Sequence, residues 1–238
     1  NLSQALMGAK SYVKHLNDKK PTVVNVFEQY LPPTITTPSP SKIEIDQIVV
    51  KKVGYWSDTT LDLIPSRLEL AQTLKNPTGK ERRLAKALSK ISSNYDLILI
   101  DCAPTESILT EAAYHCSRYA LVPVKPEFLA TIGLPLLAKS IEEFVAENSD
   151  HSLDICGIAF NHSSSYSDGP ETEASVSEVK SEASKHSWHV YDTRVRYSRS
   201  YAKAAREAAP ITRTSYVRGN VPAQFAALAD EFFVSIGV

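Results

Sequence analysis

Three short, almost continuous apolar runs stand out in the chain after residue 96. They are LILI (97–100), YALVPV (119–124) and DICGIAF (154–160), and helical patterns separate them, at about 106–117 and 131–147. Strands that are buried on both faces have such sequences, and strands that alternate with helices form parallel sheets. The pattern therefore predicts an α/β protein with a doubly wound, mostly parallel sheet and helices on both faces.

The remaining segments extend this prediction along the chain. We expect strands at 61–66 and 189–193, helices at 81–91, 199–209 and 222–236, and a loop at 161–173. The segment IEIDQIVV (43–50) fits either a helix turn or an edge strand. No shift in composition marks a boundary, so we expect a single domain over residues 1–238.

Composition narrows the class of protein. The 238 residues are 43% hydrophobic, which is ample for a folded core, and a net charge of -1 indicates neither a nucleic acid nor a membrane partner. The three cysteines, Cys102, Cys116 and Cys156, lack metal-type spacing, so we expect reduced core or near-core residues of a cytosolic protein. No signal peptide is visible, and no apolar run approaches the roughly 18 residues of a membrane span.

Asp101 ends the first apolar run, where a parallel strand would emerge from the sheet. Ligands of open parallel sheets bind beyond the carboxyl ends of the strands, which favours a ligand-binding acid. The alternative is an aspartate that forms a turn by accepting hydrogen bonds from nearby backbone amides. Position alone does not separate these alternatives.

Neighbouring segments favour the ligand-binding alternative. YDLILIDCAPTES (95–107), YALVPVKPEFLATIGLPLLAKSI (119–141) and GIAFN (157–161) occur in order, between LDLIPSRLELAQ (61–72) and YDTRVRYSRSYAKAAREAAPI (191–211). Together they resemble the ParA/MinD superfamily of deviant Walker-A P-loop ATPases over nearly the whole chain. The resemblance implies a P-loop NTPase-like fold in which Asp101 is the Walker B acid, catalytic and holding Mg²⁺ through water. It also implies that Pro104 and Thr105 belong to a switch beside the nucleotide.

Recognition of the adenine base is less determined. Asn161 follows the apolar run that ends at residue 160, and in some relatives of this superfamily an asparagine here meets adenine. A turn residue is an equally good interpretation.

A phosphate-binding loop is not found in the chain. Such a loop reads G-x-x-x-x-G-K-[ST], and the nearest segment, NPTGKER (76–82), places Glu81 after Lys80 and lacks a buried strand before it. The resemblance implies that the loop and the first two strands would precede Asn1. A family member that never had them is the less favoured alternative. We therefore expect ATP-Mg²⁺ binding and weak, partner-stimulated hydrolysis by the full-length protein, and little activity of this chain alone.

Positive charge gathers near the C-terminus. Residues 180–220 contain nine Lys or Arg and three acids, whereas the whole chain has a net charge of -1. This basic cluster is either a solvated surface with salt bridges, without a binding function, or a surface that binds a polyanion. The candidate DNA-binding residues are Arg194, Arg196, Arg199, Lys203, Arg206, Arg213 and Arg218.

The resemblance to ParA proteins implies which partners the protein has. It would form a homodimer when ATP is bound, bind DNA of the nucleoid non-specifically, and meet a ParB-like activator on a cargo. The cargo itself, whether plasmid, chromosome or protein body, is not determined.

The C-terminus separates the two branches of the superfamily. MinD-type relatives carry a basic amphipathic membrane helix there, whereas here no Lys or Arg follows Arg218. Phe225, Leu228, Phe232 and Phe233 look like core residues, which favours the ParA branch and argues against a membrane partner. Two rival functions remain: a non-catalytic DNA-binding or adaptor protein on the same fold, and a metabolic ATPase of the superfamily.

Overall fold

The computed structural model describes residues 2–28, 43–56, 59–103, 105–163, 169–217 and 219–238. The chain divides into two compact units: residues 1–116 with 205–209, and residues 117–204 with 210–238. The expected single domain over 1–238 stays a prediction.

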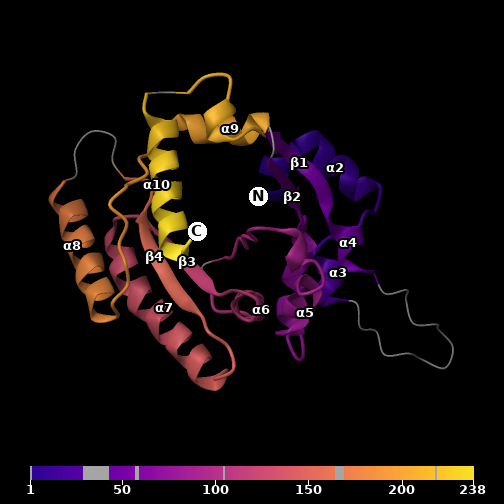
Figure 1. Ribbon diagram of the computed structural model, residues 1–238, viewed down its shortest axis with the longest axis horizontal. Helices are drawn as coiled ribbons and strands as arrows, with labels where there is room; N and C mark the ends of the chain where they lie inside the picture. Colours follow the sequence, from indigo (N-terminus) through magenta and orange to yellow (C-terminus); the bar gives the residue numbers. More distant parts are fainter. Residues whose placement is uncertain (1, 29–42, 57–58, 104, 164–168, 218) are drawn as a thin grey trace. The chain divides into compact units, whose positions relative to one another are not determined.

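The first unit contains short helices and a two-stranded antiparallel sheet (Figure 1). Its elements are α1 (Leu2–Met7), α2 (Ala9–Asn17), α3 (Val24–Phe27), α4 (Ile45–Ile48), β1 (Val50–Trp56), β2 (Thr59–Leu63), η1 (Leu68–Lys75), α5 (Arg83–Leu88), η2 (Ser92–Asn94) and α6 (Ile108–Tyr114). Residues 43–50, for which the sequence left a helix turn and an edge strand as alternatives, contain the helix turn α4 and the first residue of strand β1. The predicted strand at 61–66 corresponds to β2, two residues earlier.

The core of the first unit forms where the spacing of apolar residues predicted a helix. Leu84, Leu88 and Ile91 are buried, and they pack with Phe27 of α3 and Ile48 of α4. Leu84 and Leu88 are four residues apart and share one face of α5, and Ile91 follows the end of the helix.

The predicted buried strand at 97–100 is not observed. Residues 97–100 form no ladder in the described part of the chain, and Leu97, Ile98 and Leu99 are 41%, 37% and 74% exposed. A strand is buried on both faces only when neighbouring strands satisfy its backbone hydrogen bonds and helices cover it. None of the described strands pairs with this segment, so its apolar character alone does not bury it.

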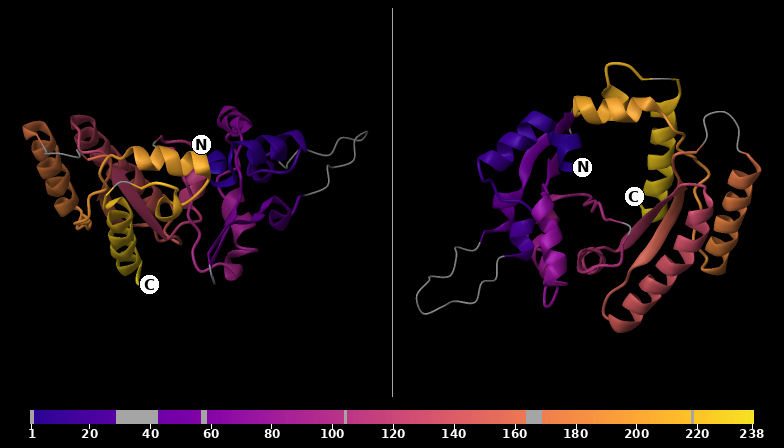
Figure 2. Two further views of the ribbon diagram at one scale, coloured as in Figure 1. Left: turned by 90° about the horizontal axis from the view of Figure 1, so that it is seen from above. Right: turned by 180° about the vertical axis from the view of Figure 1, so that it is seen from behind.

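The second unit is built on a pair of parallel strands. β3 (Tyr119–Val124) and β4 (Asp154–Phe160) are hydrogen-bonded in parallel, and α7 (Phe128–Glu147) connects them. The bounds of both strands agree with the predicted runs residue for residue. Figures 1 and 2 show α7 and α8 (Pro170–Lys185) on one side of the strands and α10 (Val221–Ile236) on the other. This arrangement of helices on both faces confirms the predicted α/β class.

Helix α8 corrects only the end of the predicted loop at 161–173, because the helix begins at Pro170, and residues 164–168 of that loop lie outside the described residues. Pro170 in the first turn, followed by Glu171 and Glu173, is a standard helix start, because proline needs no hydrogen-bond acceptor there and acids favour the helix N-terminus. The helix buries Val179 and Ala183, and it packs against α7. The predicted strand at 189–193 is reduced to an isolated parallel bridge between Val190 and Ile158.

The last helices agree with the prediction in position but not entirely in burial. α9 (Arg199–Glu207) crosses the boundary between the two units, and the short turn η3 (Ile211–Arg213) precedes α10. Phe225 and Phe233 of α10 are 44% and 39% exposed, so the prediction that they are core residues is wrong. No helix among the described residues has the length and apolar character needed to cross a membrane.

The cysteines are all free, but they differ in burial. Cys156 is buried on β4 and Cys116 is half-buried. Burial, with a smaller contribution from the field of Cys102, raises the pKa of the Cys116 thiol to about 12. Cys102 is exposed, because the segment around it is not a buried strand, so its predicted core position is wrong.

Candidate nucleotide and DNA sites

Asp101 lies in the first unit, on an exposed segment that leads into α6. Ser107 begins that helix as its N-cap and accepts a hydrogen bond from the N–H of Thr110 (3.4 Å). The Thr110 hydroxyl donates to the carbonyl oxygen of Thr105 (2.5 Å), whose own N–H donates to the Ala103 carbonyl (2.8 Å). The segment after Asp101 is therefore tied to the first turn of α6. Pro104, the other predicted switch residue, lies outside the described residues.

The donor that the described residues offer at Asp101 is one exposed carboxylate. Among the described residues, no three His, Cys, Asp or Glu side chains form a group that could hold a metal ion. Mg²⁺ usually keeps several waters and takes one or two protein carboxylates together with substrate phosphates. A single exposed carboxylate such as Asp101 is compatible with that donor set.

Asn161 lies in the second unit, directly after β4. Its N–H donates to the Val124 carbonyl (2.8 Å), and its side-chain oxygen accepts a hydrogen bond from the N–H of His162 (2.8 Å). His162 has φ 58°, so the side chain supports a left-handed turn. This geometry is that of a turn residue, and contact with adenine stays a prediction.

The rejected phosphate-loop segment has a structural role. Lys80 is buried, and its Nζ lies 2.8 Å from Oε1 of Glu28, which also accepts a hydrogen bond from the Thr73 hydroxyl (2.7 Å). The hydrogen bond to Lys80 is the main reason why the pKa of Glu28 lies below its usual range. A lysine engaged in this way holds the end of α3 and the 73–80 segment together, which supports rejecting it as a phosphate ligand.

Helix α9 gathers three of the candidate DNA-binding residues. Arg199, Lys203 and Arg206 are spaced by four and three residues, so they share one face of the helix. The Lys203 ammonium lies 5.6 Å from the centre of the Tyr216 ring. Arg213 at the end of η3 is exposed, and Arg218 lies outside the described residues.

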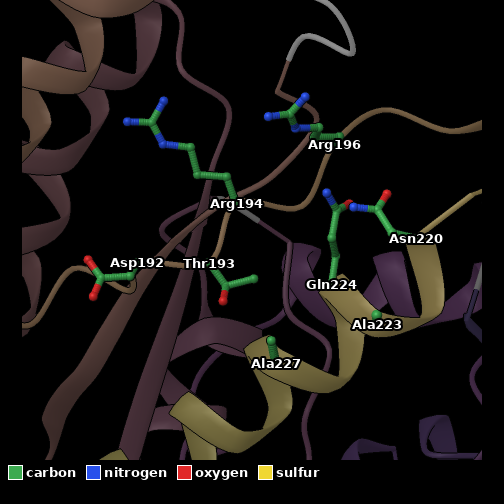
Figure 3. A pocket seen from close by; sticks show the side chains of 8 residues that line it. All are labelled: Asp192, Thr193, Arg194, Arg196, Asn220, Ala223, Gln224 and Ala227. Atoms are coloured by element: carbon green, nitrogen blue, oxygen red, sulfur yellow. The ribbon is translucent and has the colours of Figure 1, made fainter.

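The other two candidates line a pocket in the second unit (Figure 3). The pocket has a volume of about 440 Å³ and lies between residues 192–196 and the first turns of α10. It is lined by Asp192, Thr193, Arg194, Arg196, Asn220, Ala223, Gln224 and Ala227. Arg194 is half-buried, with its guanidinium carbon 5.4 Å from the centre of the Phe160 ring, whereas Arg196 is exposed.

Glu231 of α10 holds this segment in place. Its carboxylate accepts hydrogen bonds from the backbone N–H groups of Asp192 (2.7 Å) and Thr193 (2.9 Å). Burial opposes ionisation of Glu231, but the hydrogen bonds from Thr193 and Asp192 outweigh it and lower the pKa of this carboxyl. Sequence reasoning found the arginines by their charge but missed Asn220, Gln224 and Glu231, although Gln224 and Glu231 are seven residues apart on one face of the predicted helix at 222–236 and Asn220 lies just before it.

Known proteins similar to the chain agree with the motifs. The AAA domain family matches residues 7–155. An uncharacterized protein of Methanocaldococcus jannaschii is 31% identical over 136 residues, covering 56% of this chain and 51% of that protein. The sporulation initiation inhibitor protein Soj of Bacillus subtilis is 32% identical over 116 residues, covering 48% and 46%. The chain thus spans about half the length of these curated relatives.

Solved structures show the same fold. An ATP complex of a McdA variant from Cyanothece has a TM-score of 0.71 at 14% identity, over 92% of this chain and 76% of that one. Cobyrinic acid a,c-diamide synthase from Mycobacterium smegmatis, with bound ADP and magnesium, has a TM-score of 0.58 at 22% identity, over 80% and 70%. The chain is a member of the AAA domain family and of the ParA/MinD superfamily of P-loop ATPases.

Proposed function

We propose that the full-length protein is a ParA-type ATPase that positions or partitions a cargo. It would bind ATP-Mg²⁺, dimerise, bind nucleoid DNA non-specifically in the cytoplasm, and hydrolyse ATP slowly until a cargo-bound, ParB-like activator accelerates hydrolysis. Likeness to Soj and McdA supports assignment to the ParA branch of the superfamily.

The observation that carries the ATPase part of the proposal is the position of Asp101. The acid is exposed, and the segment that follows it is anchored on the N-terminus of α6. Mg²⁺ would neutralise developing charge on the phosphates during phosphoryl transfer. Asp101 would orient that ion through water, and Thr105 would belong to the switch beside the nucleotide.

The test is the variant Asp101→Ala in the full-length protein, with Asp96→Ala as the matched control. Both acids are exposed and only five residues apart, but Asp96 has no role in the proposal. We expect Asp101→Ala to abolish ATP turnover and ATP-dependent DNA binding, and Asp96→Ala to retain both. Wild-type turnover by Asp101→Ala would refute the assignment.

Two alternatives make different predictions. A non-catalytic adaptor would bind DNA without nucleotide and would not respond to Asp101→Ala. A metabolic ATPase, as the fold likeness to the diamide synthase allows, would show no salt-sensitive DNA binding. Measuring DNA binding with and without ATP at two salt concentrations separates all three.

A further inference from the structure

The pocket of the second unit contains a distinctive set of hydrogen-bond donors. Figure 3 shows the carboxamides of Asn220 and Gln224 next to each other on α10, below Arg196. Arg194 and Asp192 extend on the other side of the segment. Arg196 therefore provides a positive charge on the same side as the two carboxamides.

This arrangement is built by one face of α10. Asn220, Ala223, Gln224, Ala227 and Glu231 recur at intervals of three, one, three and four residues, which keeps them on one side of the helix. The first four line the pocket, and Glu231 accepts the backbone hydrogen bonds of Asp192 and Thr193. The same helix face therefore supplies donors and fixes the segment that carries the arginines.

We propose that this pocket binds a phosphate group of the DNA backbone, with the Asn220 and Gln224 carboxamides donating hydrogen bonds beside the Arg196 guanidinium. Glu231 is a positioning residue that sets where Arg194 and Arg196 stand. The inference rests on the proposed DNA binding and assigns residues to it that charge does not reveal. Guanidinium and amide N–H groups are the usual partners of backbone phosphates, and an alanine floor leaves room for the adjoining sugar.

The donors of the lining suit an anion with several acceptor oxygens, which a backbone phosphate of DNA provides. Phosphate oxygens accept several hydrogen bonds at once, from a guanidinium and from two neighbouring amides. The negative charge of Asp192 would repel a bound anion and so lower the affinity of the pocket for phosphate. Removing that acid should therefore strengthen binding, which an unrelated solvated surface would not show.

The experiment measures binding of a short DNA duplex by fluorescence anisotropy over a range of salt, with the full-length protein and ATP. The double variant Asn220→Ala/Gln224→Ala should weaken binding about tenfold or more, because hydrogen bonds to a charged group are lost, while the salt dependence is kept. Arg196→Ala should also reduce the slope of log K against log salt by about 1. Asp192→Asn should strengthen binding, and Lys139→Ala, at an exposed position of α7, is the control.

Glu231 needs a readout beyond loss of binding. Glu231→Ala should weaken binding and lower the salt slope, since it releases the backbone that carries both arginines. Glu231→Gln, which keeps one acceptor oxygen, should restore part of both. Circular dichroism and thermal unfolding identify a variant that has merely lost its fold.

Failure of this inference can be told apart from failure of the proposed function. If the wild type binds no DNA at low salt, the proposed function is wrong. If the wild type binds and Arg199→Glu/Arg206→Glu weakens it, but the carboxamide variants match Lys139→Ala, the pocket proposal is overturned alone. A parallel titration with AMP and with inorganic phosphate gives the remaining outcome: loss of AMP binding with unchanged DNA binding would make the pocket a nucleotide site and overturn the proposal.

Discussion

The ring of Tyr191 covers Gly157 so closely that a Cβ atom on Gly157 would lie 2.3 Å from Tyr191 Cε1. Tyr191 is almost fully buried, and its hydroxyl lies 2.6 Å from Oγ of Ser235 on α10. The missing side chain in the middle of β4 therefore lets the segment after α8 and helix α10 approach the strand.

Gly157→Ala should consequently destabilise the protein. The ring of Tyr191 cannot give way, because it is packed on all sides, and overpacking of this kind costs about 1–3 kcal/mol. Urea unfolding measures the loss. Gly133→Ala is the control: Gly133 lies in helix α7 with nothing within 4 Å of an added Cβ, and the change should stabilise by about 0.5–1 kcal/mol. Equal stability of Gly157→Ala and wild type would contradict the close contact.

The ion pair between buried Lys80 and exposed Glu28 in the first unit should matter for stability and not for nucleotide binding. Glu28→Ala leaves the Lys80 ammonium buried without its carboxylate, which should cost about 1–3 kcal/mol, reduced by the partial exposure of Glu28. Lys80→Ala should leave ATP binding by the full-length protein unchanged in a calorimetric titration. Lys86→Ala, at an exposed position of the following helix α5, should change neither property. Loss of ATP affinity in Lys80→Ala alone would reinstate the segment as a phosphate site.

Alkaline pH should weaken the second unit through Tyr191. Burial raises the pKa of Tyr191 from 10.0 to about 12, against a smaller opposing effect of the Ser235 hydrogen bond. The folded state thus favours the uncharged phenol: its contribution to stability is fully present below pH 10 and is lost as the pH rises to about 12. Urea unfolding across this range should show the decline, and Tyr191→Phe should reduce it. Part of the decline in the stability of the whole chain should persist in Tyr191→Phe, because the pKa of Cys116, in the first unit, is also raised to about 12.

Substitutions on the basic face of α9 should weaken DNA binding without changing the affinity for ATP. Arg199→Glu with Arg206→Glu reverses two charges on one helix face, so binding should weaken steeply and its salt dependence should fall. ATP affinity should stay at the wild-type level. Unchanged DNA binding at low salt would contradict the role of this face.

How far sequence patterns predict this structure depends on where each element finds its partner. The runs at 119–124 and 154–160 are neighbours joined by one helix, so they pair as predicted. The equally apolar run at 97–100 pairs with none of the described strands, although its sequence resembles that of the other two runs. α8 was missed since its surface is rich in Ser and Glu, and its apolar residues are too sparse to stand out.

The site follows the same distinction. Asp101 and the arginines were found from residue type and order, which local sequence preserves. Asn220, Gln224 and Glu231 have no unusual sequence context, and they join Arg194 and Arg196 only because α10 packs against β4.

The bounds of β3 and β4, the approximate positions of α5, α9 and α10, and membership in the superfamily follow from local patterns, because apolar periodicity and motif spacing are properties of consecutive residues. The burial of each run and the partners of each polar group depend on packing. Tyr191 against Gly157, Glu28 with Lys80, and Glu231 with the backbone at 192–193 join residues that are far apart in the chain. Such contacts form only when helices and strands fold onto one another to bury apolar surface and satisfy the backbone, so no local pattern specifies them.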